Sequence, residues 1–276
     1  MTIRNLVSCA AIMIALAPAA VADVKSGLEK FQKGEIEAAI EEFRKAADAG
    51  DYDGAFYIGR IFELGVGIAP DRAQATKLYA VAAEGKSPLA MNRLGLMYHD
   101  GDGVIRDWAR GANLICDAAD AGEPNAAFNC GMIYRDGKGR DQDKAKSMTY
   151  WTAAAAEGHI GAINLLGLAY KSGDGVAQDP IRAFEHFGRT AERGNPLGLF
   201  ELALALAEGT GTEADATRAY AYANLAAARG HPEGPKLRDQ LEAGLTSAQI
   251  SEGQAESRRM MDALSALAQG KGPLGE

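Results

Sequence analysis

The stretch "AMNRLGLMYHDGDGVIRD" (residues 90–107) decides the fold, because its Gly-x-Gly loop recurs along the chain. A loop that binds one ligand at one active site should occur once, whereas this one returns every 36 residues. A period of this length is typical of stacked structural repeats, so we do not expect the loop to bind phosphate. The five copies are Gly65/Gly67, Gly101/Gly103, Gly137/Gly139, Gly173/Gly175 and Gly209/Gly211.

Other residues keep the same spacing and predict two helices in each repeat. An aspartate follows each loop and can cap the next helix, which we call helix B, by accepting hydrogen bonds from its first turn. Helix B then ends at a glycine suited to a left-handed turn, and helix A runs from there to the next loop. The predicted caps are Asp71, Asp107, Asp143, Asp179 and Asp215, and the terminal glycines are Gly50, Gly85, Gly122, Gly158, Gly194 and Gly230.

A further glycine recurs in the middle of helix A, where it costs about 1 kcal/mol relative to alanine. We expect it to let a neighbouring helix approach closely. The fifth repeat has Ala203 at this position, so we expect a less regular stack there. The whole pattern predicts an all-α protein, an α/α right-handed superhelical solenoid of about five 36-residue helix-turn-helix repeats. The mid-helix glycines are Gly59, Gly95, Gly131 and Gly167.

These columns form the pattern A-x-x-x-L-G-x-x-Y-x-x-G-x-G-V-x-x-D, then A-x-x-W/Y-x-x-A-A-x-x-G. Residues 90–107 and "INLLGLAYKSGDGVAQD" (163–179) match it best. Over roughly residues 35–234 the chain resembles the Sel-one-like repeat (SLR) family, a relative of the tetratricopeptide repeat. The resemblance implies a non-catalytic scaffold, adaptor or regulator that binds a protein partner, such as a periplasmic sensor domain or an envelope-assembly component.

The N-terminal residues 1–22 have the features of a secretory signal peptide. One arginine precedes a short apolar segment that closes with Ala20-Val21-Ala22. We therefore expect cleavage after Ala22, a periplasmic or secreted protein, and no membrane insertion of the mature chain. That chain would hold 28 Lys and Arg against 37 Asp and Glu, a net charge of −9. Such a balance argues against nucleic acid as a partner.

The two ends of the repeat array are expected to differ from its middle. Residues 23–50 and 231–268 predict capping helices that cover the terminal apolar surfaces of the five repeats in 51–230. The last of these helices should begin at a capping box made by Thr246 and the three residues after it. The tail, residues 269–276, is predicted to be disordered.

Two cysteines remain after signal-peptide removal, Cys116 late in a helix B and Cys130 in the next helix A. They are symmetric about residue 123, where a tight turn is expected, and symmetric positions of an antiparallel helix hairpin face each other. In an oxidising compartment they predict a disulfide of structural role. The alternative is a pair of buried reduced thiols.

The sequence predicts no catalytic chemistry, no metal site and no cofactor. Its four histidines form no ligand cluster with cysteine, and no Ser-x-x-K or Gly-x-Ser-x-Gly nucleophile motif occurs. The abundant carboxylates are explained as helix caps and solvated faces. We therefore predict that the protein is not an enzyme.

Function is instead expected on a surface, the concave groove lined by successive A helices. Apolar groove residues rimmed by Asn and Arg suit an extended peptide or a partner helix. The alternative for any one of these residues is that it packs against the next A helix. The alternative is a cell-wall-active protein that binds or hydrolyses peptidoglycan or a β-lactam, but the groove has few cations for an anionic glycan. The predicted groove residues are Phe56, Arg60, Asn92, Leu96, His99, Phe128, Met132, Arg135, Asn164, Leu168, Lys171, Phe200 and Leu204.

Overall fold

The computed structural model describes residues 23–268, and helices account for all of its regular structure in that range. The expected signal peptide and disordered tail lie outside these residues. The fourteen helices are α1 Val24–Gln32, α2 Ile36–Asp48, α3 Asp53–Leu64, α4 Arg72–Glu84, α5 Pro88–Asp100, α6 Trp108–Asp120, α7 Pro124–Asp136, α8 Lys144–Ala156, α9 Ile160–Ser172, α10 Pro180–Ala191, α11 Pro196–Glu208, α12 Ala216–Ala228, α13 Gly234–Glu242 and α14 Ser247–Ala268.

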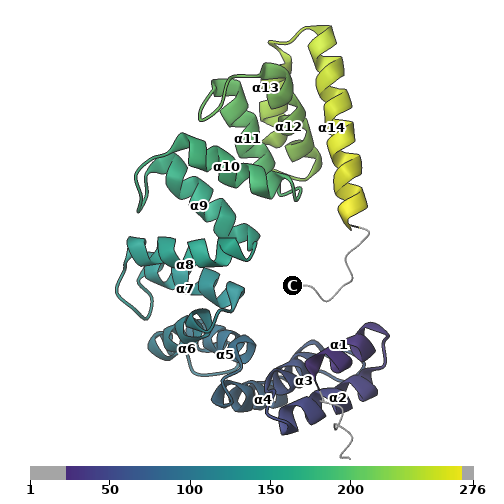
Figure 1. Cartoon of the computed structure of the whole chain (residues 1–276), viewed down its shortest axis with the longest axis vertical. Helices are drawn as coiled ribbons and strands as arrows, with labels where there is room; N and C mark the ends of the chain where they lie inside the picture. The colour runs from purple at the N-terminus through teal and green to yellow at the C-terminus, as the bar shows by residue number, and fades with distance from the viewer. Residues whose placement is uncertain (1–22, 269–276) are drawn as a thin grey trace, which may run out of the picture.

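Successive helices pair and stack into an open arc, with α1 and α2 at one end and α14 at the other (Figure 1). Each odd-numbered helix from α3 to α11 is a predicted helix A, and each even-numbered helix that follows it is a helix B. Successive A helices also contact one another, from α1 through α3 and α5 to α7. The predicted all-α repeat architecture is confirmed. Among residues 23–268, no helix is both long and apolar enough to span a membrane.

The turn from helix A to helix B has the predicted chemistry in every repeat. The first glycine of each Gly-x-Gly pair ends helix A in the left-handed region, and the second glycine also has a positive φ. The aspartate that follows accepts a hydrogen bond from the backbone N–H three residues on, as Asp71 does from Gln74 at 2.9 Å. The other four aspartates make the same bond.

The mid-helix glycine leaves room for a large side chain of helix B. A Cβ built on Gly131 would lie 2.4 Å from the ring of Trp151. In the other three repeats that contain this glycine, the facing side chains are Tyr79, Ile115 and Phe187. Each of these large side chains is buried. The free energy gained by burying it offsets the lower helix propensity of the glycine.

The fifth repeat solves the same packing problem with two small residues. Ala203 replaces the glycine, and the facing position of helix B is Ala223, where the other repeats have a large residue. Both alanines are fully buried in one cluster with Leu237 of α13. Helix α11 keeps the 13 residues of α5, α7 and α9. In the length of its helix A the fifth repeat is therefore as regular as the three before it, and it differs from them in the packing of this residue pair.

The left-handed turn after α4 lies one residue beyond its predicted position. Gly85 has a φ of −73°, and the left-handed position belongs to Lys86, with a φ of 67°. The 36-residue spacing places residue 86, not 85, in line with Gly50 and Gly122, so the backbone follows the repeat and not the residue type. Lysine at a positive φ is strained relative to glycine.

The C-terminal end is closed by α13 and α14. The capping box that starts α14 is present, because Thr246 N–H donates to Gln249 Oε1 at 3.0 Å and Gln249 N–H donates to Thr246 Oγ1 at 3.3 Å. Met260, Met261 and Leu264 of α14 pack on the apolar cluster of α10, α11 and α12. These contacts cover a surface that a further repeat would otherwise cover.

Candidate functional site

An apolar hollow with polar groups at its rim lies among the A helices of the N-terminal half. Its volume is about 390 Å³, and α1, α3, α5 and α7 supply its walls. Leu28, Phe31, Leu64, Val66 and Leu89 contribute apolar surface. Leu64 is 58% exposed, so part of this apolar surface is open to solvent.

Amide and guanidinium groups form the polar side of this hollow. Asn129 Nδ2 donates to Asn92 Oδ1 at 3.0 Å and thereby joins α7 to α5. Asn125 Nδ2 donates to Glu123 Oε1 at 2.9 Å, next to the N-terminus of α7. Arg60 also lines the hollow. The arrangement can accept an apolar side chain and offer hydrogen bonds to the chain that carries it.

The structure brings the predicted groove residues together only in part. Phe56, Arg60, Asn92 and Leu96 line the 390 Å³ hollow. Leu96 also lines a second hollow of about 220 Å³ between α5 and α7, and the predicted residues that join it there are His99, Phe128 and Met132. Lys171 and Leu204 line a third hollow of about 160 Å³ near α9, α10 and α11.

Many of the predicted residues are engaged with neighbouring side chains of the solenoid. Asn164 is only 9% exposed, and its Nδ2 donates to Asn195 Oδ1 at 3.1 Å. Leu168 packs on the C-terminal apolar cluster, and the rings of Phe200 and His231 stack 4.0 Å apart. Arg135 Nε donates to Asp136 Oδ1 at 2.7 Å. The Asn164 amide nitrogen is therefore already engaged within the solenoid, and its binding of a peptide backbone stays a prediction.

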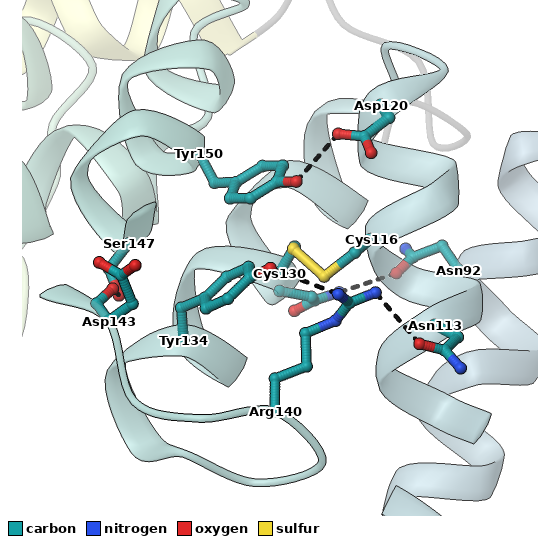
Figure 2. The surroundings of a disulfide bond; sticks show 11 residues. Asn92, Asn113, Cys116, Asp120, Cys130, Tyr134, Arg140, Asp143, Ser147 and Tyr150 are labelled. Atoms are coloured by element: carbon teal, nitrogen blue, oxygen red, sulfur yellow. Dashed lines mark hydrogen bonds between the residues drawn. A yellow bond between two sulfur atoms is a disulfide. The ribbon is translucent and has the colours of Figure 1, made fainter. Parts of the chain in front are cut away.

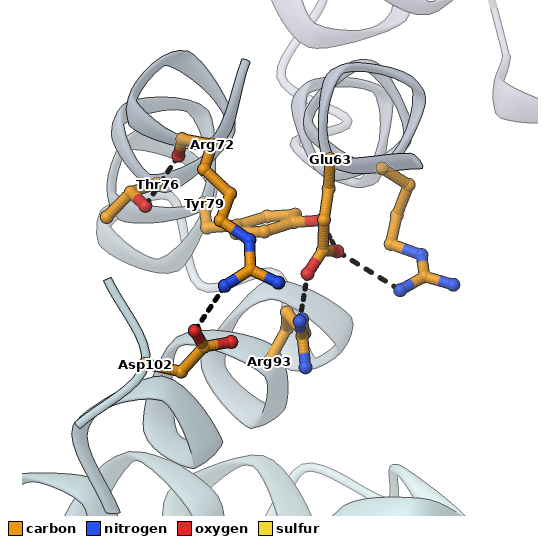
Figure 3. A network of polar contacts seen from close by, with 7 residues as sticks. Glu63, Arg72, Thr76, Tyr79, Arg93 and Asp102 are labelled. Carbon is orange, nitrogen blue, oxygen red and sulfur yellow. Dashed lines mark hydrogen bonds and ion pairs between the residues drawn. The ribbon is translucent and has the colours of Figure 1, made fainter. Parts of the chain in front are cut away.

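A buried carboxylate organises the edge of the 390 Å³ hollow. Glu63 accepts hydrogen bonds from Tyr79 Oη at 2.6 Å and from Arg93, and it pairs with Arg60 at 3.2 Å (Figure 3). Burial would raise the pKa of Glu63, but the bonds from Arg93 and Tyr79 and the two positive charges outweigh it and lower the pKa. Glu63 is therefore an anion that fixes α3, α4 and α5 together.

The same inter-repeat link recurs three repeats later with the charges exchanged. Lys171 and Glu201 stand 108 residues after Glu63 and Arg93, and Lys171 Nζ lies 2.5 Å from Glu201 Oε2. The side chain of Glu201 is 9% exposed. The two positions thus form an ion pair whichever of the two helices carries the acid. This indicates that the pair stabilises the contact between successive repeats.

The predicted disulfide is present between α6 and α7. Cys116 and Cys130 are bonded with a Cα–Cα distance of 5.1 Å, and both are buried (Figure 2). Around it, Arg140 Nη2 donates to Asn113 Oδ1 at 3.1 Å and Tyr150 Oη donates to Asp120 at 2.9 Å. Burial and the bond to Asp120 raise the pKa of Tyr150 to about 12. The disulfide links two successive repeats, as the symmetric positions of the two cysteines about residue 123 predict.

The sequence missed the contribution of the first helix to the hollow. Residues 23–50 were assigned to a cap, yet α1 presents Leu28 and Phe31 to the hollow as a helix A would. A signal was present, since Phe43 and Ala46 of α2 stand 36 residues before Tyr79 and Ala82. The first pair is thus a degenerate repeat that also lines the candidate site.

Comparison with known proteins is consistent with this architecture. A solved Sel1 repeat protein from Oxalobacter formigenes is 24% identical, with a TM-score of 0.71 over 87% of this chain and 98% of that chain. An SLR-fold protective antigen, c5321, from uropathogenic Escherichia coli is 20% identical, with a TM-score of 0.56 over 92% of this chain and 65% of that chain. At these identities the likeness shows the fold alone. No curated protein matches the sequence.

The family model described as "Sel1 repeat" matches six segments of the chain. This is one more than the five predicted repeats, because the first segment covers α2. Sel1 repeats are generally non-enzymatic scaffolds for protein–protein interaction. The matched segments are 33–51, 53–87, 88–123, 124–159, 160–195 and 196–231. Since these segments cover most of its length, the chain belongs to the Sel1 repeat family.

Proposed function

We propose that this protein is a non-catalytic periplasmic adaptor that holds a protein partner in the hollow between α1, α3, α5 and α7. The observation that carries the proposal is the combination of an apolar wall, including the exposed Leu64, with amide groups at its rim. A polypeptide offers both an apolar side chain and a backbone that needs hydrogen bonds. An anionic glycan would need more cations than this hollow holds.

Export to the periplasm is part of the proposal and has two supports. The first is the signal-peptide pattern of residues 1–22. The second is the Cys116–Cys130 bond, since disulfides persist in oxidising compartments and are rare in the cytosol. Cell fractionation of the full chain tests this, with a processed protein beginning at Asp23 as the expected result.

Binding in the hollow is tested by site-specific photo-crosslinking in cells. A photoreactive residue at Leu64 or Leu89 should crosslink to one protein, because both positions line the hollow. The same residue at Val81, which is 50% exposed on α4, serves as the matched control. Equal products from all three positions would contradict the proposal, and so would crosslinks to cell-wall fragments alone.

A second arm separates binding from folding. Leu64→Asn places an amide in the apolar wall of the hollow and should abolish capture of the crosslinked partner. Because Leu64 is 58% exposed, the substitution should leave the far-UV circular dichroism and the melting temperature nearly unchanged. A variant that folds and still captures the partner would move the binding surface elsewhere on the solenoid.

A further inference from the structure

A second surface lies outside the hollow, in the loop that joins α5 to α6 (Figure 1). Ile105 is 92% exposed and Trp108 is 44% exposed, and both line an open hollow of about 500 Å³. Single exposed apolar residues are normal on a protein surface. Two large ones, three residues apart and sharing one hollow, form a patch that requires an explanation.

The repeat itself provides an internal control for Trp108. One repeat earlier the same position is Arg72, which pairs with Asp102 in the next loop, and one repeat later it is Lys144, whose Nζ lies 2.6 Å from Asp174. Those two residues link neighbouring loops. The residue at the partner position for Trp108 in this series is Lys138. A tryptophan carries no negative charge, so it cannot form an ion pair with Lys138. The Trp108 side chain therefore does not replace the link between loops.

The stack does not need Ile105 either. The corresponding residues of the other repeats are Ala69, Asp141, Ala177 and Glu213, which are small or polar. A β-branched apolar side chain that is 92% exposed gains almost nothing from the fold. Its burial becomes favourable only when something outside the chain covers it.

Cations surround this apolar patch. The Arg106 guanidinium carbon lies 5.2 Å from the centre of the Trp108 ring, and that of Arg110 lies 4.2 Å from the centre of the Tyr98 ring. Both arginines are exposed and line the same hollow. The carboxylate within the hollow, Asp107, accepts a hydrogen bond from Arg110 N–H at 3.0 Å as a helix cap.

The next loop adds a further positive charge close by. A Cβ built on Gly139 would lie 2.2 Å from the Trp108 carbonyl oxygen, so residues 137–139 press on the start of α6. The exposed Lys138 lies within this loop. The side chains that line the hollow thus carry two positive charges against one carboxylate, although the whole chain has a net charge of −8. Such a local reversal of sign favours an acidic partner.

We propose that Ile105, Arg106, Trp108 and Arg110 form a docking surface for a polypeptide segment in which acidic residues flank an apolar side chain. The apolar side chain would cover Ile105 and the ring edge of Trp108, and the flanking carboxylates would reach Arg106 and Arg110. Guanidinium groups already held against aromatic faces lose little freedom when they bind a carboxylate. This surface is separate from the hollow between α1, α3, α5 and α7, so the protein could hold two partners at once.

The test is selection of a displayed library of random 12-residue peptides on the full mature chain. Recovered peptides should be rich in Asp and Glu next to Leu, Phe or Trp. Their affinity should fall at least tenfold for Trp108→Ala and for the Arg106→Ala/Arg110→Ala double variant. Lys144→Ala, at the equivalent position one repeat later, is the matched control and should bind as the parent does. The hollow variant Leu64→Asn should also leave this binding intact.

A second readout uses the two tryptophans of the chain. Trp108 is 44% exposed and Trp151 is 5% exposed, so iodide should quench Trp108 selectively in the unaltered protein. A selected acidic peptide should protect that emission from iodide, and the protection should weaken at high salt. The proposal is overturned if no peptide is recovered, if recovered peptides are not acidic, or if they bind both variants equally. It is also overturned if heparin, an acidic polysaccharide, protects Trp108 and no peptide does.

Discussion

Replacing Gly111 with alanine tests whether the close approach of α5 and α6 holds the repeat together. A Cβ on Gly111 would lie 2.7 Å from the Gly95 carbonyl oxygen and 2.9 Å from the His99 backbone nitrogen. Both obstacles are backbone atoms, so the two helices must separate. Alanine gains about 1 kcal/mol of helix propensity, whereas overpacking of this kind costs typically about 1–3 kcal/mol. Since the obstacles are rigid, we expect the upper part of that range and a net destabilisation of about 1–2 kcal/mol.

The matched control is Gly188→Ala in α10, where a new Cβ would have nothing within 4 Å. Only the propensity gain remains there, so Gly188→Ala should stabilise the chain by up to about 1 kcal/mol. Thermal unfolding followed by circular dichroism should show Tm lowered by roughly 2–8 °C for Gly111→Ala and raised by roughly 2–4 °C for Gly188→Ala. A Gly111→Ala variant as stable as the parent would refute the close-approach explanation, because the two substitutions differ only in what surrounds the added methyl group.

Three further predictions concern the bonds between repeats. Reducing the Cys116–Cys130 disulfide removes a closed loop of about 15 residues and should lower the free energy of unfolding by about 3 kcal/mol, which urea titrations with and without dithiothreitol would measure. Because the folded-state pKa of Glu63 is lowered, its contribution to stability is present above the ordinary pKa of 4.5 and is lost as the pH falls through the lower folded value. Glu63→Gln should therefore flatten the loss of Tm between pH 7 and about pH 3. Lys171→Glu should destabilise the chain by about 1 kcal/mol, and adding Glu201→Lys should restore most of the lost stability in a double-mutant cycle. If the second substitution restores no stability, the two charges of this ion pair cannot be exchanged.

The fold was predictable because a repeat states each structural rule several times. One aspartate after one glycine loop is weak evidence for a helix cap, whereas five at equal spacing can be explained only by a recurring backbone. The disulfide was predictable for a related reason, since a hairpin with a known turn at residue 123 places Cys116 opposite Cys130. The turn at Lys86 is a case in which a prediction from residue type fails. There, residue type and spacing disagree, and the backbone follows the spacing.

The groove was less predictable because some outward-facing side chains of helix A contact the next repeat and so do not line a free surface. In three repeats, the residue three before the mid-helix position contacts the start of the next helix A, 31 residues later. Phe128 stacks on His159 in this way, with ring centres 4.4 Å apart, and Asn164 donates to Asn195. A single repeat cannot reveal this contact, since its partner belongs to the next one. The 31-residue offset was nevertheless readable from the sequence, as Phe200 stands 31 residues before His231.

Recognition in this protein should be sought where residues depart from the repeat, not where they follow it. A residue that recurs, such as the capping aspartate, is explained by the fold and would be present whatever the partner. Trp108 and Ile105 occur once, are exposed, and differ from the equivalent residues of other repeats, which link neighbouring loops or are small or polar. Leu64 likewise exposes an apolar side chain at a helix end beside the hollow. Because solenoid stability is nearly a sum over neighbouring repeats, such departures can arise in one repeat without disturbing the others.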